Sequence, residues 1–141
     1  MKRQGNQNAI YRVLDANLNR CKEAFRVLED LARFILNDSS ACSKLKSMRH
    51  RVTQASFGFS VSYAKLLQTR HSQNDVGKTS SIVDKKKTHL SDVAAMNFKR
   101  TQESLRVLEE VSKLITPKLH QKFQTLRFEC YELEKKILRK F

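Results

Sequence analysis

The chain has 141 residues, enough for one domain with a buried core, and its 40% of apolar residues argue against disorder. Three Gly and one Pro supply few of the turns that a many-stranded sheet needs, so the composition favours an all-α protein. The net charge of +14 indicates an anionic partner, which leaves nucleic acid, an acidic membrane surface and a small polyphosphate open.

Apolar residues recur at helical spacing in four segments, which predicts helices at about 8–36, 41–69, 89–115 and 117–140. In the first of them Leu14, Leu18, Cys21 and Phe25 alternate steps of four and three residues. The second keeps its apolar stripe past Gly58, which we expect to be tolerated inside the helix. Residues 70–88 show no period and form the one long loop, a kind of segment that often carries function.

The first and third predicted helices carry one sequence pattern twice. Segment 17–30 returns as 97–110 with a constant shift of 80 residues, as from Arg20 to Arg100, and its frame Asn-x-x-Arg-x-x-Glu-x-x-Arg-Val-Leu-Glu keeps polar residues as faithfully as apolar ones. A weaker echo, shifted by 78 residues as from Arg49 to Arg127, links the second and fourth helices. The repeated unit is therefore a helical hairpin. We expect a single helical domain, an antiparallel four-helix bundle of hairpin one (about 8–69) and hairpin two (about 89–140) with quasi-twofold symmetry.

Helical spacing puts the repeated Asn17 and Arg20 on a stripe that continues into small or apolar residues and should face the bundle interior. Glu23 lies three residues further along, within reach of Arg20, and can neutralise it. The counterparts in the second copy are Asn97, Arg100 and Glu103. Two interpretations are open: a buried ion-pair belt that fixes the helix register, or a polar cavity between the copies in which the arginines bind a phosphorylated ligand.

The segment Gly77-Lys78-Thr79 invites comparison with a phosphate-binding loop, but Ser72 stands where that motif needs a glycine, and no strand precedes it. A weaker interpretation remains, in which Asp75-Val76-Gly77 is a flexible lid that brings an amide-rich turn or Lys78 onto phosphates.

Other charged and ligand-type residues give weaker signals. We interpret segments 29–33 and 109–113 as solvated helix faces. Asp30 and Glu110 could instead bind a divalent cation, but no clustered carboxylates single out a metal ligand. The histidines have no ligand-like spacing, so a zinc site is not expected. The cysteines are scattered, no apolar run reaches membrane-spanning length, and nothing resembles a signal peptide, so we expect a cytoplasmic protein with reduced thiols.

Five motifs follow one another along the chain. They are Leu14-Asp15-Ala16-Asn17-Leu-Asn19-Arg20-x-x-Glu23-x-x-Arg26-Val-Leu-Glu29-Asp30-x-x-Arg33-Phe34, Leu45-x-x-x-Arg49-His50, Arg70 with Asp75-Val76-Gly77, the second Asn-x-x-Arg frame, and Leu126-Arg127-x-x-x-Tyr131-x-x-Glu134. In this order, from about Tyr11 to Lys136, they resemble the small monofunctional hydroxymethylpyrimidine phosphate kinases, which occur alone or fused ahead of thiamine-phosphate synthase.

The resemblance implies transfer of the γ-phosphoryl group of ATP to hydroxymethylpyrimidine monophosphate, which gives the diphosphate used in thiamine biosynthesis. It also implies ATP and Mg²⁺ as cofactors and a functional link to thiamine-phosphate synthase. Two departures, Met96 where the first copy has Ala16 and Lys99 where it has Asn19, suggest that the copies are not equivalent in function.

On this hypothesis positioning and charge neutralisation suffice for phosphoryl transfer. The arginines bind the phosphates of the substrate and of ATP, and the asparagines orient them. The glutamates hold the arginines, or one of them accepts the proton of the attacking phosphate. The candidate residues are Arg20, Glu23, Arg100 and Glu103 for catalysis and Asn17, Asn97, Arg49, Arg127, Asp75, Gly77 and Lys78 for phosphate binding.

The alternative is a basic helical module that binds nucleic acid, supported by the charge and by the run Lys85-Lys86-Lys87, or a non-catalytic regulatory module. Against nucleic acid, no recognised DNA or RNA motif is present and aromatic residues are few outside the apolar stripes. We therefore expect a phosphorylated pyrimidine and ATP as partners, with no nucleic acid and no membrane. A homo-oligomer is left open.

Overall fold

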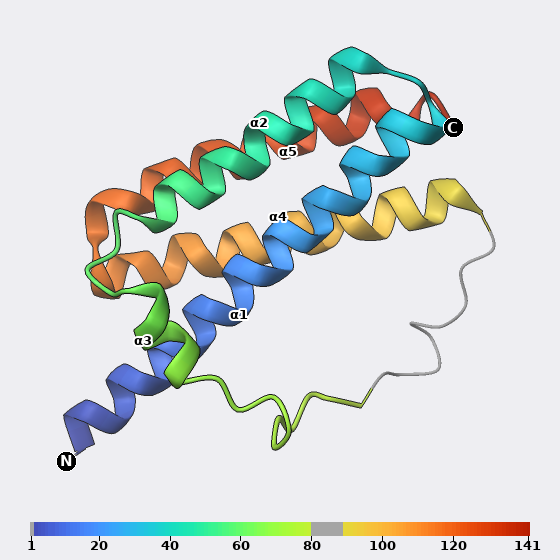
Figure 1. The fold of residues 1–141 in the computed structure, drawn as a ribbon. Coiled ribbons are helices and arrows are strands. Elements are labelled where there is room, and N and C mark those ends of the chain that lie inside the picture. Colours follow the sequence, from blue (N-terminus) through green and yellow to red (C-terminus); the bar gives the residue numbers. More distant parts are fainter. Residues whose placement is uncertain (1, 80–88) are drawn as a thin grey trace.

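A computed structural model describes residues 2–79 and 89–141, and in these ranges the chain is all-α, with no strand (Figure 1). The elements in chain order are α1 (Lys2–Asp30), the π-helical turn η1 (Leu31–Ile35), α2 (Ser39–Ser56), α3 (Tyr63–Gln68), α4 (Leu90–Ile115), the 3-10 turn η3 (Pro117–Leu119) and α5 (His120–Leu138). The predicted fold class is confirmed.

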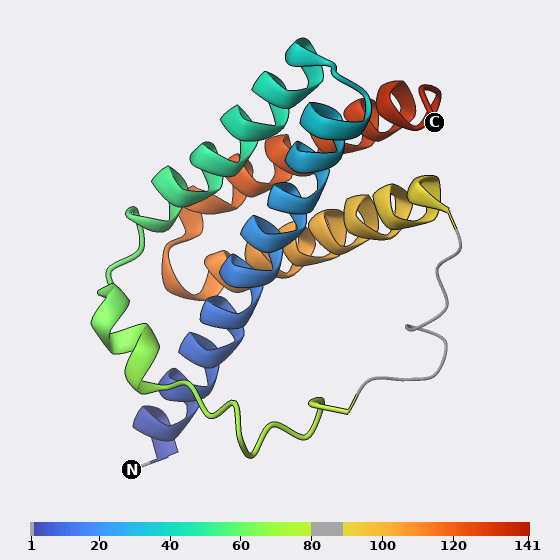
Figure 2. The ribbon, with the colours of Figure 1, turned by 45° about the vertical axis from the view of Figure 1, so that its right-hand side comes forward.

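The four long helices form two hairpins, α1 with α2 and α4 with α5, and the members of each hairpin run in opposite directions (Figures 1 and 2). α1 also packs across α4, again in the opposite direction, whereas α2 and α5 meet more lightly. The two copies of the repeated pattern therefore lie on helices that touch, which brings residues 80 positions apart into one neighbourhood.

The core lies between these helices and uses the predicted apolar stripes. Leu14, Leu18, Cys21 and Phe25 of α1 are all buried, as their alternating spacing requires. The largest side chains with no contact with solvent are three phenylalanines, one each from α1, α4 and α5: Phe25, Phe98 and Phe123. Burying one such side chain stabilises the fold by about 1.5–3 kcal/mol relative to leaving it exposed, so these helices are held mainly by their apolar faces.

The turn between α1 and α2 is short because two neighbouring residues have special roles. Asn37 adopts a left-handed backbone conformation (φ 50°), which Asn tolerates better than most residues. Asp38 then caps α2 by accepting a hydrogen bond from the Ala41 amide at 2.9 Å, and its carboxylate also pairs with Lys140. The turn thereby ties the start of α2 to the C-terminal end of α5.

The second predicted helix, at 41–69, is wrong in one respect: α2 ends at Ser56, and the chain bends before α3. Gly58 lies in this bend at a point of close approach, since a Cβ there would lie 2.8 Å from Cδ2 of Leu119. The close approach of η3 leaves no room for a side chain at this point. The apolar stripe continues past the bend because Phe59 is buried and stacks on Phe123, with ring centroids 5.9 Å apart.

Residues 70–79 contain no helix, in agreement with the predicted loop. The segment leaves α3 next to the N-terminal half of α1 and then continues away from that helix (Figures 1 and 2). The rest of the predicted loop, including Lys85-Lys86-Lys87, lies outside the described residues.

Candidate functional site

A cavity of about 630 Å³ opens between α1 and α4, and we call it the seam pocket. Its α1 wall consists of Asn17, Arg20, Glu23, Ala24 and Val27, and its α4 wall consists of the five residues 80 positions later. The two walls are thus the two copies of the repeat, facing one another. The volume lies within the usual range for a small-molecule site.

The asparagines of the seam pocket are buried in both copies, as their position on the stripe predicts. Asn17 donates a hydrogen bond from Nδ2 to the carbonyl of Val13 at 2.8 Å, and Asn97 donates the same bond to Val93 at 2.8 Å. Each bond fixes an amide against its own helix, so the repeat reproduces side-chain geometry as well as sequence.

The arginines behave differently from the prediction. Arg20 and Arg100 line the seam pocket but are exposed, because a long side chain at the edge of a helix seam can carry its charge out to water. Within residues 2–79 and 89–141 neither one forms a salt bridge, so the expected pairing with Glu23 and Glu103 is wrong. The two guanidinium groups are therefore free to bind an anion.

The predicted phosphate ligands Arg49 and Arg127 are not brought to the seam pocket. Arg49 donates to Glu29 at 2.8 and 3.3 Å, and Arg127 lies 2.9 and 2.8 Å from one carboxylate oxygen of Glu109. The two glutamates are only 5% and 2% exposed, so the interpretation of their segments as solvated faces is wrong at these positions. One ion pair thus lies inside each hairpin, between α1 and α2 and between α4 and α5.

The environment of Glu29 shows how such a pair is balanced. Burial opposes ionisation of the carboxyl group, but the hydrogen bonds and charge of Arg49, with further positive charge from Arg26 and Lys46, outweigh it. The pKa of Glu29 is accordingly held below its ordinary value, and the carboxylate is ionised at neutral pH.

A second cavity, of about 770 Å³, continues from the seam pocket under the segment 70–75, and we call it the loop cavity. It shares Asn17, Arg20, Glu23 and Val107 with the seam pocket. At its side, Arg70 donates to both carboxylate oxygens of Asp15 at 2.8 and 2.9 Å. These hydrogen bonds raise the pKa of Arg70 against the opposing effect of desolvation. Sequence reasoning did not pair Asp15 with Arg70, since no periodicity links residues 55 positions apart.

Of the predicted loop residues, Asp75 lines the loop cavity, whereas Gly77 and Lys78 line neither cavity. Their backbone amides fold back on Asp75 instead. The Gly77 amide donates to the Asp75 carboxylate at 2.9 Å and the Lys78 amide donates to the Asp75 carbonyl at 3.1 Å.

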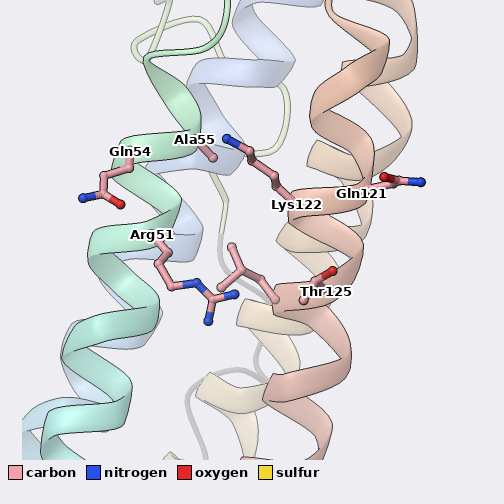
Figure 3. Close-up of a pocket in the computed structure, with 7 residues that line it drawn as sticks. Arg51, Gln54, Ala55, Gln121, Lys122 and Thr125 are labelled. Atoms are coloured by element: carbon pink, nitrogen blue, oxygen red, sulfur yellow. The ribbon is translucent and has the colours of Figure 1, made fainter.

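On the opposite side of the bundle, between α2 and α5, a smaller cavity of about 380 Å³ is lined by residues that do not converge (Figure 3). Arg51 and Lys122 point into it, but Gln54 and Gln121 point away. Arg51 is already engaged with Glu129 at 2.6 and 2.9 Å. The seam pocket is therefore the better candidate for a ligand site.

Comparison with protein families finds a family model that matches residues 12–136, a range that contains both copies of the repeat. The chain belongs to the ThiD2 family. No solved structure matches it.

Beyond the ThiD2 family match, the chain is similar to proteins named thiamine-phosphate synthase. It is 37% identical to that of Rhodopirellula baltica over 133 residues, which are 91% of the chain and 35% of the relative. It is 31% identical to that of Nostoc punctiforme over 133 residues (94% and 36%), and 33% identical to that of Synechocystis sp. over 138 residues (96% and 38%). The chain thus spans about a third of the length of these curated relatives. The expected link to thiamine-phosphate synthase is confirmed, while the kinase activity stays a prediction.

Two further findings bear on what the site can hold. None of the helices in the described ranges combines the length and hydropathy needed to cross a bilayer. In the same part of the chain no three His, Cys, Asp or Glu residues gather into a metal site. Glu23 and Glu103, however, bring two carboxylates to the seam pocket. That donor set suits Mg²⁺, which binds through one or two carboxylates together with water and substrate phosphates.

Proposed function

We propose that this chain is an ATP-dependent kinase that converts hydroxymethylpyrimidine monophosphate to the diphosphate in thiamine biosynthesis. Membership of the ThiD2 family and similarity to thiamine-phosphate synthases support the pathway. The observation that carries the reaction is the seam pocket, where Arg20 and Arg100 are exposed and form no salt bridge in the described part of the chain. A pair of cationic forks in one pocket suits a reaction between two phosphorylated substrates.

In this reaction an oxygen of the substrate phosphate attacks the γ-phosphorus of ATP. A new P–O bond forms, the bond from the γ-phosphorus to the bridging oxygen breaks, and ADP leaves with the electron pair. The nucleophile is a phosphate that is already largely ionised near neutral pH, so no strong base is needed. What the protein must supply is alignment and positive charge around the transferred group, which are the properties of the two arginines.

The remaining seam residues have supporting roles in this proposal. Asn17 and Asn97 orient the phosphates from the floor of the pocket. Glu23 and Glu103 would hold Mg²⁺ together with substrate oxygens, and the bound ion supplies positive charge to the phosphates. Arg49 and Arg127, engaged with buried glutamates, stabilise the hairpins instead of binding substrate.

A direct assay tests the proposal. The purified chain, incubated with ATP, Mg²⁺ and hydroxymethylpyrimidine monophosphate, is expected to form the diphosphate and ADP in equal amounts. Unphosphorylated hydroxymethylpyrimidine is the matched control and should react poorly, because the arginines need its phosphate for positioning. Absence of diphosphate at high enzyme concentration would overturn the kinase proposal.

A further inference from the structure

The two ends of the seam pocket are related by the repeat but are not equivalent. The segment 70–75 covers only the end formed by Asn17 and Arg20, where the loop cavity begins. Given the kinase function proposed above, we propose that the pyrimidine monophosphate binds at this covered end and that ATP enters from the end formed by Arg100. Asp15 and Arg70 are a positioning pair that determines which end binds the pyrimidine.

The covered end is held by a two-bond contact between Arg70 and Asp15. Asp15 is 5% exposed on the side of α1, while Arg70 reaches it from the loop at 2.8 and 2.9 Å. A bidentate arginine–carboxylate pair fixes orientation as well as distance. The segment that follows Arg70 is thereby fastened above the cavity.

Among the described residues, the second copy has no counterpart of the Asp15–Arg70 contact. The positions 80 residues after Asp15, Ala16 and Asn19 are Ala95, Met96 and Lys99. Ala95 has no carboxylate that could fasten a loop, and Lys99 lies 3.6 Å from Glu134 on α5. The asymmetry of the pocket therefore comes from sequence differences between copies that are otherwise alike.

The chemistry of the covered end suits a small heterocycle. The ring nitrogens of a pyrimidine accept hydrogen bonds, and the cavity offers side chains that can donate them, from Asn19, His71 and Ser72. Arg20 belongs to both cavities, so a ring under the loop would bring its phosphate to that guanidinium. The γ-phosphoryl group of ATP would then approach from the side of Arg100. The substrate phosphate and the γ-phosphoryl group would thus meet in the seam pocket from opposite ends.

The test separates the two substrates by their Michaelis constants. Asp15→Asn and Arg70→Gln are each expected to raise KM for the pyrimidine monophosphate by about tenfold or more while KM for ATP stays within about twofold. The matched control is Glu129→Gln, which weakens another bidentate pair, formed with Arg51 on the far side of the bundle. It should leave both constants unchanged. A rise in KM for ATP alone, or no change in either constant, would contradict the assignment.

A binding measurement keeps this inference separate from the kinase proposal. Calorimetric titration of the wild type with the pyrimidine monophosphate, without ATP, should show binding that Arg70→Gln weakens by the same factor. If the wild type makes no diphosphate but shows this loss, the kinase proposal fails and the substrate site stands. Equal binding by both proteins, or no binding by the wild type, overturns the site. Arg70 lies outside the helices, so this variant serves even if Asp15→Asn does not fold.

Discussion

Two pairs of repeated arginines in this molecule have opposite environments. Arg20 and Arg100 lie exposed at the seam pocket and form no salt bridge within the described ranges, whereas Arg49 and Arg127 lie inside the hairpins against buried glutamates. Both pairs are recovered by the internal repetition, the first with a shift of 80 residues and the second with a shift of 78. Repetition of a charged residue therefore does not by itself separate a candidate binding residue from a residue in a buried ion pair, whereas the presence of a buried partner separates the two environments.

The contrast also revises the two interpretations that the sequence left open. An ion-pair belt does exist, but it is built on Glu29 and Glu109, further along the same helices, and not on Arg20 and Arg100. Removing one member of a buried pair leaves an uncompensated charge, whereas truncating an exposed arginine without a partner changes stability little. The comparison can thus be tested by measuring stability and activity on the same variants.

The largest effect is expected for Arg127→Ala. The change leaves Glu109, which is 2% exposed, without its main cationic partner, and should lower the free energy of unfolding by about 3–5 kcal/mol. Urea denaturation measures it. Arg51→Ala is the control, since it breaks an exposed ion pair whose contribution is about 0–1 kcal/mol. Equal losses of unfolding free energy in the two variants would show that burial does not determine how much these ion pairs contribute to stability.

The next effect concerns activity. Arg20→Ala and Arg100→Ala should each reduce turnover by about 100-fold to 1,000-fold, as expected when a group that stabilises transition-state charge is lost. Their free energies of unfolding should stay within about 0.5 kcal/mol of the wild type, because neither side chain is buried. Initial rates and urea denaturation on the same preparations measure both. Arg33→Ala, an exposed arginine outside both cavities, should retain full activity, and a collapse of stability in the seam variants would favour a structural role.

The smallest effect is a change with pH. Arg49→Ala should cost about 2 kcal/mol near neutral pH, since it removes the main partner of Glu29. In the wild type the pKa of Glu29 is lowered, so its contribution is present above the unfolded-state pKa of about 4.3 and is lost as pH falls through the folded-state value. In the Arg49→Ala variant less positive charge opposes the effect of burial on Glu29, so the pKa of this carboxyl group is higher than in the wild type. The difference in unfolding free energy between the two proteins should therefore narrow from about pH 7 to about pH 4; a gap that widens would contradict the assignment.

Much of this architecture could be predicted because it depends on local periodicity. Steps of three and four residues identified the buried stripes, and the 80-residue shift identified which residues of the two helices line the seam. The errors lie where distant segments meet. The bend after α2 brings Gly58 close to Leu119, which is 61 residues away in the chain, and the covered end of the pocket depends on Arg70 reaching Asp15. The apolar spacing of the second segment does not reveal the end of α2 at Ser56, because Phe59, which lies beyond the bend, is still buried.

The ion pair between Arg51 and Glu129 joins two residues that are 78 positions apart, the same shift that relates the second helix of one hairpin to that of the other. Arg51 in the first hairpin and Glu129 in the second therefore occupy equivalent positions. They meet on the quasi-twofold axis that relates the two hairpins. Two copies of the first hairpin would bring arginine against arginine at this point, and two copies of the second would bring glutamate against glutamate. The pair thus favours association of unlike hairpins and disfavours self-association of either one.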